Sequence, residues 1–318
     1  MTAHAIPGNV TRVLILGTGA LASYIGGRLG HAHTAEVTLM GSWRAALDAI
    51  GGTGLVVDEG GRRFTTPLRT CHTGAPPPQA DIVLVLVKSP HTAAVAHTAA
   101  RASAPDGLVV TFQNGLGNAE LLESAAPGRV ARGATTTATM ILAPGVVRGA
   151  AGETWIEARG QRLAPLFSAA DLPLHPVADV DAVVWRKLVA SCAILPLTAL
   201  HGVRNGALLE RPELRALASE VAREVVDVAL ARGIELGPDA PELALAVAAR
   251  TGANRSSMLR DLERGVATEI DALCGAVARE GLRLGVATPL NLRLWREVRE
   301  REGRASCLAD IAFGEAQA

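Results

Sequence analysis

The segment GTGALA at residues 17–22 has the spacing of a glycine turn that binds nucleotide phosphates. It follows the apolar run 13–16 and precedes a stretch with helical spacing of apolar residues. In this pattern the first glycine allows a tight turn, the second lets the backbone approach a pyrophosphate, and Ala22 keeps the helix close to the strand. The phosphates then lie at the helix N-terminus. The segment therefore predicts a dinucleotide site, with a ligand-free glycine turn as the alternative.

The residues expected near the ribose of this nucleotide include no acid. An NAD site usually has Asp or Glu about 20 residues after the glycine segment, where it holds the ribose 2′-hydroxyl. Here residues 40–44 read MGSWR. A carboxylate would repel a 2′-phosphate, whereas Ser42 can donate a hydrogen bond to it and Arg44 can pair with it. The sequence therefore favours NADP, although Arg44 could equally be a solvated charge on a helix surface.

A βαβ unit is needed to position these residues, and the apolar pattern predicts one. Residues 13–16 are typical of a buried strand, and Leu21, Ile25 and Leu29 form a helical stripe after them. Further apolar runs, which suit strands buried on both faces of a parallel sheet, lie at residues 36–40, 82–87 and 108–112.

Residues 54–67 predict a β-hairpin inserted in this sheet, because two strand-like runs flank the turn signal DEGG at 58–61. Three more extended segments are expected at residues 135–141, 145–148 and 154–158, after which the strand signals stop. From about Asp181 the chain is rich in Ala, Leu, Arg and Glu at helical spacing. We therefore predict an α/β protein, with an N-terminal Rossmann-type doubly wound sheet at 1-179 and an all-helical C-terminal domain at 180-318.

Composition narrows the function classes. The 318 residues include 31 basic and 31 acidic side chains, so the formal net charge is zero, which argues against nucleic acid or an anionic membrane as a partner. No uninterrupted apolar run reaches the roughly 18 residues of a membrane span, and the N-terminus lacks the pattern of a secretory signal, so we expect a cytoplasmic protein. No metal site is expected, since the cysteines form no CxxC pair and have no His at ligand spacing. These expected reduced, structural thiols are Cys71, Cys192, Cys274 and Cys307.

Nearly the whole chain resembles the ketopantoate reductase family, also called 2-dehydropantoate 2-reductases, in separate motifs that occur in the family's order. The motifs are GTGALA at 17–22, VKS at 87–89, QNGLG at 113–117, GATTT at 133–137, WRKL at 185–188, PLTAL at 196–200, NRSSML at 254–259 and TEID at 268–271. The resemblance implies an N-terminal Rossmann domain, a helical C-terminal domain and NADPH-dependent reduction of a 2-keto acid.

The resemblance also implies the catalytic residues. The family's general acid falls on Lys187, whose ammonium would stabilise the alkoxide left by hydride addition and supply its proton. The family's glutamate falls on Glu269, which would orient the lysine or bind the nicotinamide ribose and the substrate hydroxyl. From the residues alone, Lys187 could be a surface lysine, and Glu269 an exposed carboxylate of a helix whose buried stripe is Ile270, Leu273 and Val277.

The resemblance further assigns ligand contacts, some of which have local alternatives. Of Ser256 and Ser257, one could cap a helix while the other receives a carboxylate. The residues expected to contact the cofactor are Gly17, Thr18, Gly19, Ala20, Leu21, Ala22, Ser42, Arg44, Lys88, Asn114, Thr139 and Glu269. The residues expected to contact the substrate are Asn114, Lys187, Ser191, Leu195, Asn205, Asn254 and Ser257.

Two positions depart from the family pattern. The family commonly has asparagine four and eight residues after its catalytic lysine, where this chain has Ser191 and Leu195. At these spacings both share a helix face with Lys187, so both are expected to face the substrate. The Leu195 side chain cannot form a hydrogen bond. A small polar substrate would therefore have polar groups without a partner, and each would cost about 1 to 3 kcal/mol of binding free energy. The lysine chemistry is retained, while a bulkier or more apolar 2-keto acid, or a cyclic imine, becomes plausible.

The sequence thus predicts an NADPH-dependent reductase of a 2-keto acid that acts on a small-molecule substrate. The alternatives within enzymes are a D-2-hydroxyacid dehydrogenase and an imine reductase on the same scaffold. A non-catalytic nucleotide sensor is disfavoured, because a sensor needs neither Lys187 nor Glu269. The Ala-rich helix expected at 214–232 suits packing inside a monomer as well as against a second subunit, so a homodimer stays open.

Overall fold

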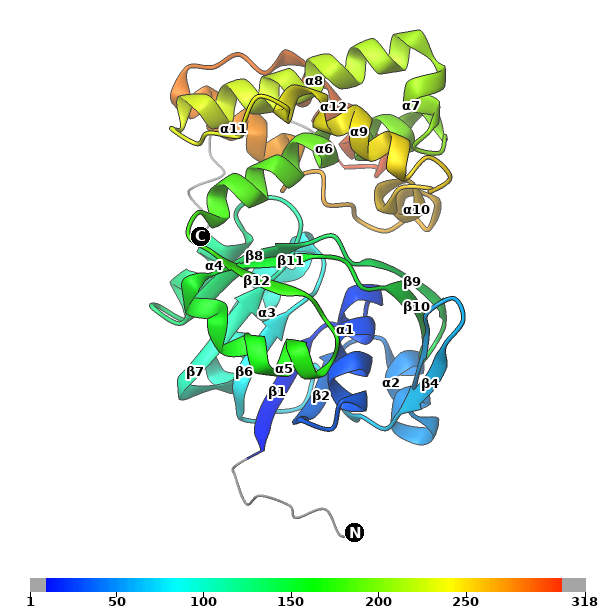
Figure 1. Cartoon of the computed structure of the whole chain (residues 1–318), viewed down its shortest axis with the longest axis vertical. Coiled ribbons are helices and arrows are strands. Elements are labelled where there is room, and N and C mark those ends of the chain that lie inside the picture. Colours follow the sequence, from blue (N-terminus) through cyan, green and yellow to red (C-terminus); the bar gives the residue numbers. More distant parts are fainter. Residues whose placement is uncertain (1–9, 305–318) are drawn as a thin grey trace. The chain divides into compact units, whose positions relative to one another are not determined.

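The computed structural model of the chain describes residues 10–304, which form two compact units (Figure 1). Unit 1 contains the described residues up to Val87, together with 92–113 and 122–178. Unit 2 contains 88–91, 114–121 and the described residues from Asp179 onward. The two short segments follow strands of unit 1 in sequence, yet they pack with the helical unit. Cys307 lies outside the described residues.

Unit 1 is built on an eight-stranded sheet in the order β12-β11-β8-β7-β6-β1-β2-β5. The strands from β5 to β8 are parallel, β11 is antiparallel to β8, and β12 is parallel to β11. The strands are β1 (Thr11–Leu16), β2 (Ala35–Gly41), β5 (Arg69–His72), β6 (Ala80–Val85), β7 (Ser103–Thr111), β8 (Val130–Thr135), β11 (Thr154–Glu157) and β12 (Leu174–Val177). The parallel part has the strand order of a doubly wound dinucleotide-binding sheet, as predicted.

Two sequence-based expectations about this unit were wrong. The predicted hairpin exists as β3 (Leu55–Asp58) and β4 (Arg63–Thr66), but it belongs to a separate sheet of order β4-β3-β10-β9. Its other strands are β9 (Ala138–Ala143) and β10 (Val146–Ala150), which pairs in parallel with β3. Strands also do not stop near residue 158, because β12 pairs with β11 at the edge of the main sheet.

The helices of unit 1 include α1, which packs against both sheets. A Cβ at Gly26 would touch Ile15 and Leu39 of the main sheet, and a Cβ at Gly27 would collide with Val57 of the second sheet. Both glycines therefore allow α1 to lie close to strands on two sides. The helices are α1 (Ala20–His31), α2 (Arg44–Thr53), α3 (Thr92–Ala102), α4 (Asn118–Ala125, shared with unit 2), α5 (Ala164–Ala169) and the 3₁₀ helix η2 (Ala158–Leu163).

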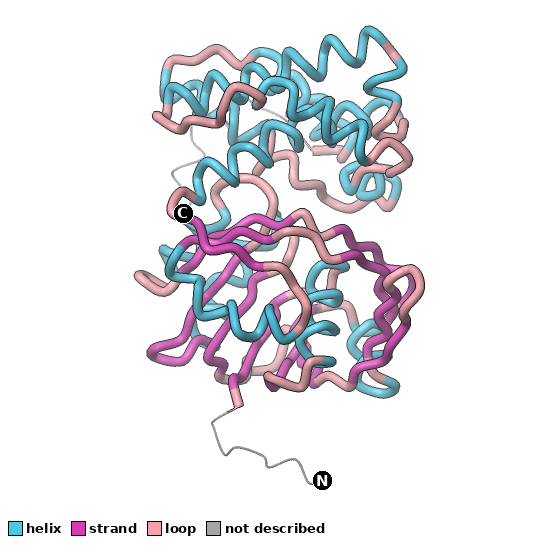
Figure 2. Tube along the Cα trace, in the orientation of Figure 1, coloured by secondary structure: helices cyan, strands magenta, loops and turns pink. Residues whose placement is uncertain are grey.

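Unit 2 consists of helices and loops, and Figure 2 shows no strand in its described part. This agrees with the helical pattern of the sequence after Asp181. Its helices are α6 (Val180–His201), α7 (Ala207–Glu210), α8 (Pro212–Ala231), α9 (Leu243–Arg250), α10 (Ser257–Glu263), α11 (Cys274–Leu284), α12 (Pro289–Arg301) and the 3₁₀ helices η1 (Ser89–His91) and η3 (Ala240–Glu242).

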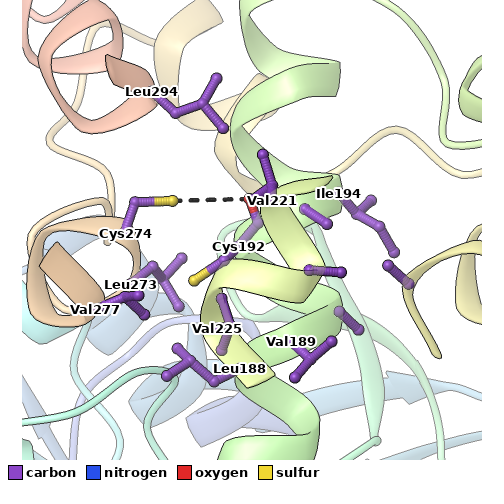
Figure 3. Packing of buried hydrophobic residues seen from close by; sticks show 14 of the residues in the cluster. Leu188, Val189, Cys192, Ile194, Val221, Val225, Leu273, Cys274, Val277 and Leu294 are labelled. Atoms are coloured by element: carbon purple, nitrogen blue, oxygen red, sulfur yellow. Dashed lines mark hydrogen bonds between the residues drawn. The ribbon is translucent and has the colours of Figure 1, made fainter. Parts of the chain in front are cut away.

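The helix α6 forms the centre of unit 2. It begins where Asp179 accepts a hydrogen bond from the Ala182 amide at 3.0 Å, and it ends at Gly202 in the left-handed conformation. Figure 3 shows its buried face against α8 and α11, with Cys192 and Cys274 among the apolar side chains. Among the described helices, α6 alone is long and apolar enough to cross a membrane, but most of it is buried inside the unit. It is therefore a core helix.

Candidate active site

The glycine segment forms the turn between β1 and α1 in unit 1. Gly17 has a φ of +131°, and a Cβ there would approach the Leu86 carbonyl oxygen to 2.9 Å, so the position requires glycine. Gly19 is the N-cap of α1, where no side chain caps the helix and a Cβ would meet nothing within 4 Å. Open space above uncapped helix N–H groups suits a phosphate. Ala22 is fully buried against the sheet, which keeps α1 close.

The end of β2 touches this turn. A Cβ at Gly41 would lie 2.7 Å from the Thr18 side chain, so the two loops are in contact. Ser42 and Arg44 are exposed, and Arg44 is the first residue of α2. The residues that follow β2 thus offer a hydroxyl and a guanidinium, and no carboxylate, beside the glycine turn.

Three other residues expected at the cofactor lie at different places in the fold. Ala20 and Leu21 begin α1 and are half-buried, so their backbone N–H groups belong to the uncapped first turn. Thr139 lies on β9 in the second sheet of unit 1, opposite Gly149 of β10. No hydrogen bond among the described residues joins Thr139 to the glycine turn, so its cofactor contact stays a prediction.

Glu269 is the centre of a hydrogen-bond cluster in unit 2. Its Oε1 accepts from the backbone N of Ser89 at 3.3 Å and is 3.1 Å from the Ser89 hydroxyl. Its Oε2 accepts from the Asn114 side-chain amide at 2.9 Å. Asn118 donates to the Ser89 hydroxyl and to the Asn114 carbonyl. The carboxylate is therefore held in one orientation by residues that are distant from it in sequence.

The position of Glu269 differs from the predicted helix. Residues 269–273 form a bend and a turn, and α11 begins only at Cys274. The Ala272 carbonyl accepts from the Leu116 backbone N at 2.8 Å. Leu273, the N-cap of α11, has a ψ of −106°, which is outside the helical region. A turn that is hydrogen-bonded to residue 116 thus stands where the first turn of the predicted helix was expected.

Lys187 lies on α6 in the same unit and is half-buried. Burial lowers the pKa of its ammonium to about 8, and the negative charge of Glu269 acts in the opposite direction. The two residues named as a catalytic pair are therefore close enough to interact electrostatically. An ammonium with a pKa near neutral pH can donate a proton to an alkoxide and recover it from water.

Lys88 forms an ion pair with Asp261. Asp261 was not among the site residues predicted from the sequence. Asp261 is 5% exposed and lies on α10. Burial raises the pKa of its carboxyl, while Lys88 acts in the opposite direction and Glu269 adds to the increase. Lys88, Asp261, Glu269 and Lys187 thus form a group of two cations and two anions inside unit 2.

The remaining residues expected at the substrate lie on α6 and in the loops before α7 and α10. Ser191 and Leu195 are both half-buried on α6, at helical spacing from Lys187. Asn205 is buried, and its backbone N donates to the Asn254 carbonyl at 2.9 Å, so these two positions are brought together. The structure records no contact that joins either asparagine to Lys187 within the described residues.

The two serines of NRSSML have different roles in the structure. Ser256 is buried and caps α10, where its hydroxyl accepts from the Leu259 backbone N at 3.2 Å and from Thr198 at 2.8 Å. Ser257 is exposed, so its hydroxyl is accessible to a ligand. Ser256 is therefore the capping residue of the pair.

Four residues of these clusters were not named from the sequence: Ser89, Asn118, Thr251 and Asp261. Ser89 lies within the VKS motif, and Asn118 directly follows QNGLG, so those motif positions were available as a signal. Thr251 and Asp261 lie beside NRSSML without being part of it. Nothing in their local sequence distinguishes them from surface polar residues.

Both parts of the chain match described protein families. Residues 13–161 match the family described as Ketopantoate reductase PanE/ApbA, and residues 179–302 match the one described as Ketopantoate reductase PanE/ApbA C terminal. A protein named 2-dehydropantoate 2-reductase from Halobacterium salinarum is 37% identical over 290 residues, which are 88% of this chain and 95% of that protein. A protein of the same name from Pyrococcus horikoshii is 32% identical over 302 residues, with 92% and 97% covered.

The fold of this chain is also similar to those of solved structures. The crystal structure of a PanE/ApbA family ketopantoate reductase from Ralstonia eutropha has a TM-score of 0.86 at 33% identity, covering 92% of this chain and 98% of that one. The ternary structure of D-mandelate dehydrogenase with NADH and anilino(oxo)acetate also has a TM-score of 0.86, with the same coverage, at 24% identity. At that identity the likeness shows a shared fold alone.

Proposed function

The chain belongs to the ketopantoate reductase PanE/ApbA family, and on that premise we propose that it reduces a 2-keto acid with NADPH, using Lys187 as general acid. The observation that carries the proposal is the half-buried Lys187, whose pKa is lowered to about 8 beside a carboxylate that is held in place. A solvated surface lysine would have neither feature.

NADPH, when bound, supplies the hydride that adds to the carbonyl carbon. The carbonyl π electrons then move to the oxygen, and Lys187 Nζ stabilises this alkoxide and transfers a proton to it. The products are the 2-hydroxy acid and a neutral lysine, which regains its proton from water. The Glu269 carboxylate attracts the Lys187 ammonium and keeps its own orientation through Asn114 and Ser89.

The choice of NADP over NAD rests on the loop after β2. Ser42 and Arg44 are exposed beside the glycine turn and provide a donor and a positive charge for a 2′-phosphate. No carboxylate stands there to bind a free 2′-hydroxyl. The glycine turn would hold the pyrophosphate, with Lys88, Asn114, Thr139 and Glu269 as the other proposed cofactor contacts.

A second candidate substrate follows from Ser191 and Leu195. Both are half-buried at helical spacing from Lys187, and Leu195 offers only apolar contact. This favours a bulkier, more apolar 2-keto acid or a cyclic imine, so that the enzyme would act as a D-2-hydroxyacid dehydrogenase or an imine reductase. The double change Ser191→Asn with Leu195→Asn should shift the ratio of kcat/KM values toward ketopantoate. One methylene group in a hydrophobic pocket changes such a ratio by about 10- to 200-fold.

The experiment that tests the proposed function is NADPH oxidation by the purified protein with a panel of 2-keto acids and imines. Turnover of at least one 2-keto acid is expected. Tight NADPH binding with no turnover of any compound would favour the nucleotide sensor instead. A cytoplasmic location and a small-molecule substrate, with no nucleic-acid or membrane partner, complete the proposal, and gel filtration distinguishes a monomer from a homodimer.

A further inference from the structure

The turn that carries Glu269 is hydrogen-bonded on both sides of that residue to a single helix of unit 2. Just before it, the backbone N of Thr268 donates to Glu302 Oε1 at 2.6 Å. Just after it, Asp271 Oδ1 accepts from the indole Nε1 of Trp295 at 2.7 Å. Trp295 lies on α12, and Glu302 is the C-cap of the same helix. The end of α12 therefore supports the turn at two points that flank the carboxylate.

Glu302 is a buried carboxylate rather than a solvated one. Its side chain is 3% exposed, and its Oε2 accepts from Arg304 at 2.9 Å. A charge inside a protein is tolerated only when it is paired and hydrogen-bonded. The Thr268 backbone N–H is one of its donors, so a shift of that backbone would leave a buried charge with one partner fewer. The position of the backbone next to Glu269 is therefore costly to change.

Asp271 anchors the other side of the turn through its side chain and its backbone. Its Oδ2 accepts from Arg304 at 2.8 Å, and its backbone carbonyl accepts from Arg279 at 2.7 Å. Burial acts to raise the pKa of this carboxyl, but the hydrogen bond from Trp295 and the charges of Arg304 and Arg299 hold the pKa below its ordinary value. The ionised carboxylate is thus kept as an acceptor for the indole.

The Trp295 side chain is fixed by the packing around it. It is fully buried, and a Cβ at Gly275 would come within 2.8 Å of its ring, so the indole has little room to move. The ring N–H is its one polar group, and a buried indole usually requires a partner for it. That group is directed at Asp271. A rigid donor on α12 therefore determines where the turn can lie.

We propose that Trp295 and Glu302 are positioning residues, which hold the turn so that the Glu269 carboxylate stays close to the proposed general acid. The inference rests on the proposed function, because it adds a support to the pair of residues on which that function depends. It gives neither Trp295 nor Glu302 a contact with substrate or cofactor. Both act only through the backbone on either side of Glu269.

The test measures the pH dependence of kcat/KM for reduction, with NADPH and the best 2-keto acid. Trp295→Phe keeps an aromatic ring but removes the N–H. If the turn then shifts, the charge of Glu269 raises the pKa of Lys187 by less. The falling limb should move to lower pH by about 0.5 unit or more, and kcat should fall about tenfold. Lys88 and Asp261, the other charged residues of this cluster, are unchanged in the variant.

Three further variants separate positioning from a general loss of stability. Val298→Ala removes buried apolar volume from α12, so it should lower the free energy of unfolding in urea and leave the limb in place. Glu302→Ala removes the second support and should move the limb to lower pH. It also replaces Trp295→Phe in the test if that variant does not fold. In a Glu269→Gln background, Trp295→Phe should move the limb no further, because the charge through which it acts is absent.

Three results would overturn the inference and leave the proposed function standing. If Trp295→Phe and Glu302→Ala lower stability without moving the limb, both residues are only structural. If Trp295→Phe moves the limb equally with and without the Glu269 charge, it acts by another route. If Glu269→Gln itself leaves the limb in place, the supported carboxylate is not coupled to Lys187. A wild-type enzyme that reduces no 2-keto acid would instead refute the proposed function, and the inference with it.

Discussion

Burial lowers the pKa of the Lys187 ammonium to about 8, which is close to the pH at which the proposed general acid would act. Donation to the alkoxide requires the ammonium form, which is lost as the pH rises through this value. We therefore expect kcat/KM for reduction to fall above about pH 8, and oxidation of the 2-hydroxy acid to rise over the same range. Steady-state profiles in both directions measure this. A reduction rate that stays constant from about pH 7 to 10 contradicts it.

The Glu269 carboxylate raises the Lys187 pKa that burial lowers. Glu269→Gln keeps the shape and removes the charge, so the falling limb of the pH profile should move to lower pH. Turnover and affinity should both decrease, because we propose that the same carboxylate orients Lys187 and contacts the ligands. Glu263→Gln, which removes an exposed carboxylate from α10, is the control and should leave the limb in place. An unshifted limb in Glu269→Gln would mean that the two charges are uncoupled.

Arg44 tests the cofactor preference at a single side chain. The guanidinium is exposed at the start of α2, where a 2′-phosphate would pair with it. Arg44→Ala should weaken NADPH binding about tenfold and leave NADH binding unchanged, which calorimetric titration can measure. Arg101→Ala, at an exposed arginine of the same unit, is the matched control. Equal losses for both nucleotides would assign Arg44 a role in folding rather than in phosphate binding.

The loop after β7 holds Asn114 next to Glu269, and two of its glycines allow this positioning to be tested. Gly115 and Gly117 both have left-handed backbones, with φ of +83° and +88°, but a Cβ at Gly115 would collide with the Ala272 carbonyl oxygen while Gly117 faces open space. Gly117→Ala should cost about 1 kcal/mol from backbone strain alone. Gly115→Ala should lower the free energy of unfolding by more than Gly117→Ala does. It should also raise KM, because the displaced loop would move Asn114 away from Glu269. Urea denaturation and kinetics on both variants check this, and equal effects would refute the close packing.

The elements show which features a sequence pattern can predict. The glycine turn was predictable because an apolar run typical of a strand, two glycines and apolar residues at helical spacing follow one another within about 20 residues. The hairpin at 54–67 was also predictable, but its sheet was not. Its partner β10 lies about 90 residues later in the chain, and no local signal indicates that Val146 pairs with Val56.

The turn at Glu269 shows a second limit of predicting secondary structure from the sequence pattern. Ile270, Leu273 and Val277 have helical spacing and are all buried, so the pattern favoured a helix through Glu269. The turn that is present instead is hydrogen-bonded to the Leu116 backbone, which is far away in sequence. The spacing of apolar residues correctly indicated which residues are buried, but it did not indicate that α11 begins only at Cys274.

Across the whole molecule, the cluster around Glu269 and Asp261 is made of long-range contacts. Ser89 and Asn114 meet Glu269 across 180 and 155 residues, and Lys88 meets Asp261 across a comparable separation. The resemblance to a family was therefore what named Lys187 and Glu269, since local spacing alone described a surface lysine and a helix carboxylate. Asp261 and Thr251, which no motif included, became visible only through their partners in the fold.

The proposed reaction depends on one proton donor in a 318-residue chain, so the most direct test removes it. The measurement is the turnover rate of Lys187→Ala against wild type, with NADPH and the best 2-keto acid, alongside NADPH affinity. General acid catalysis predicts that turnover falls by about 10²-fold or more while NADPH affinity barely changes. A variant that turns over at nearly the wild-type rate would contradict the account.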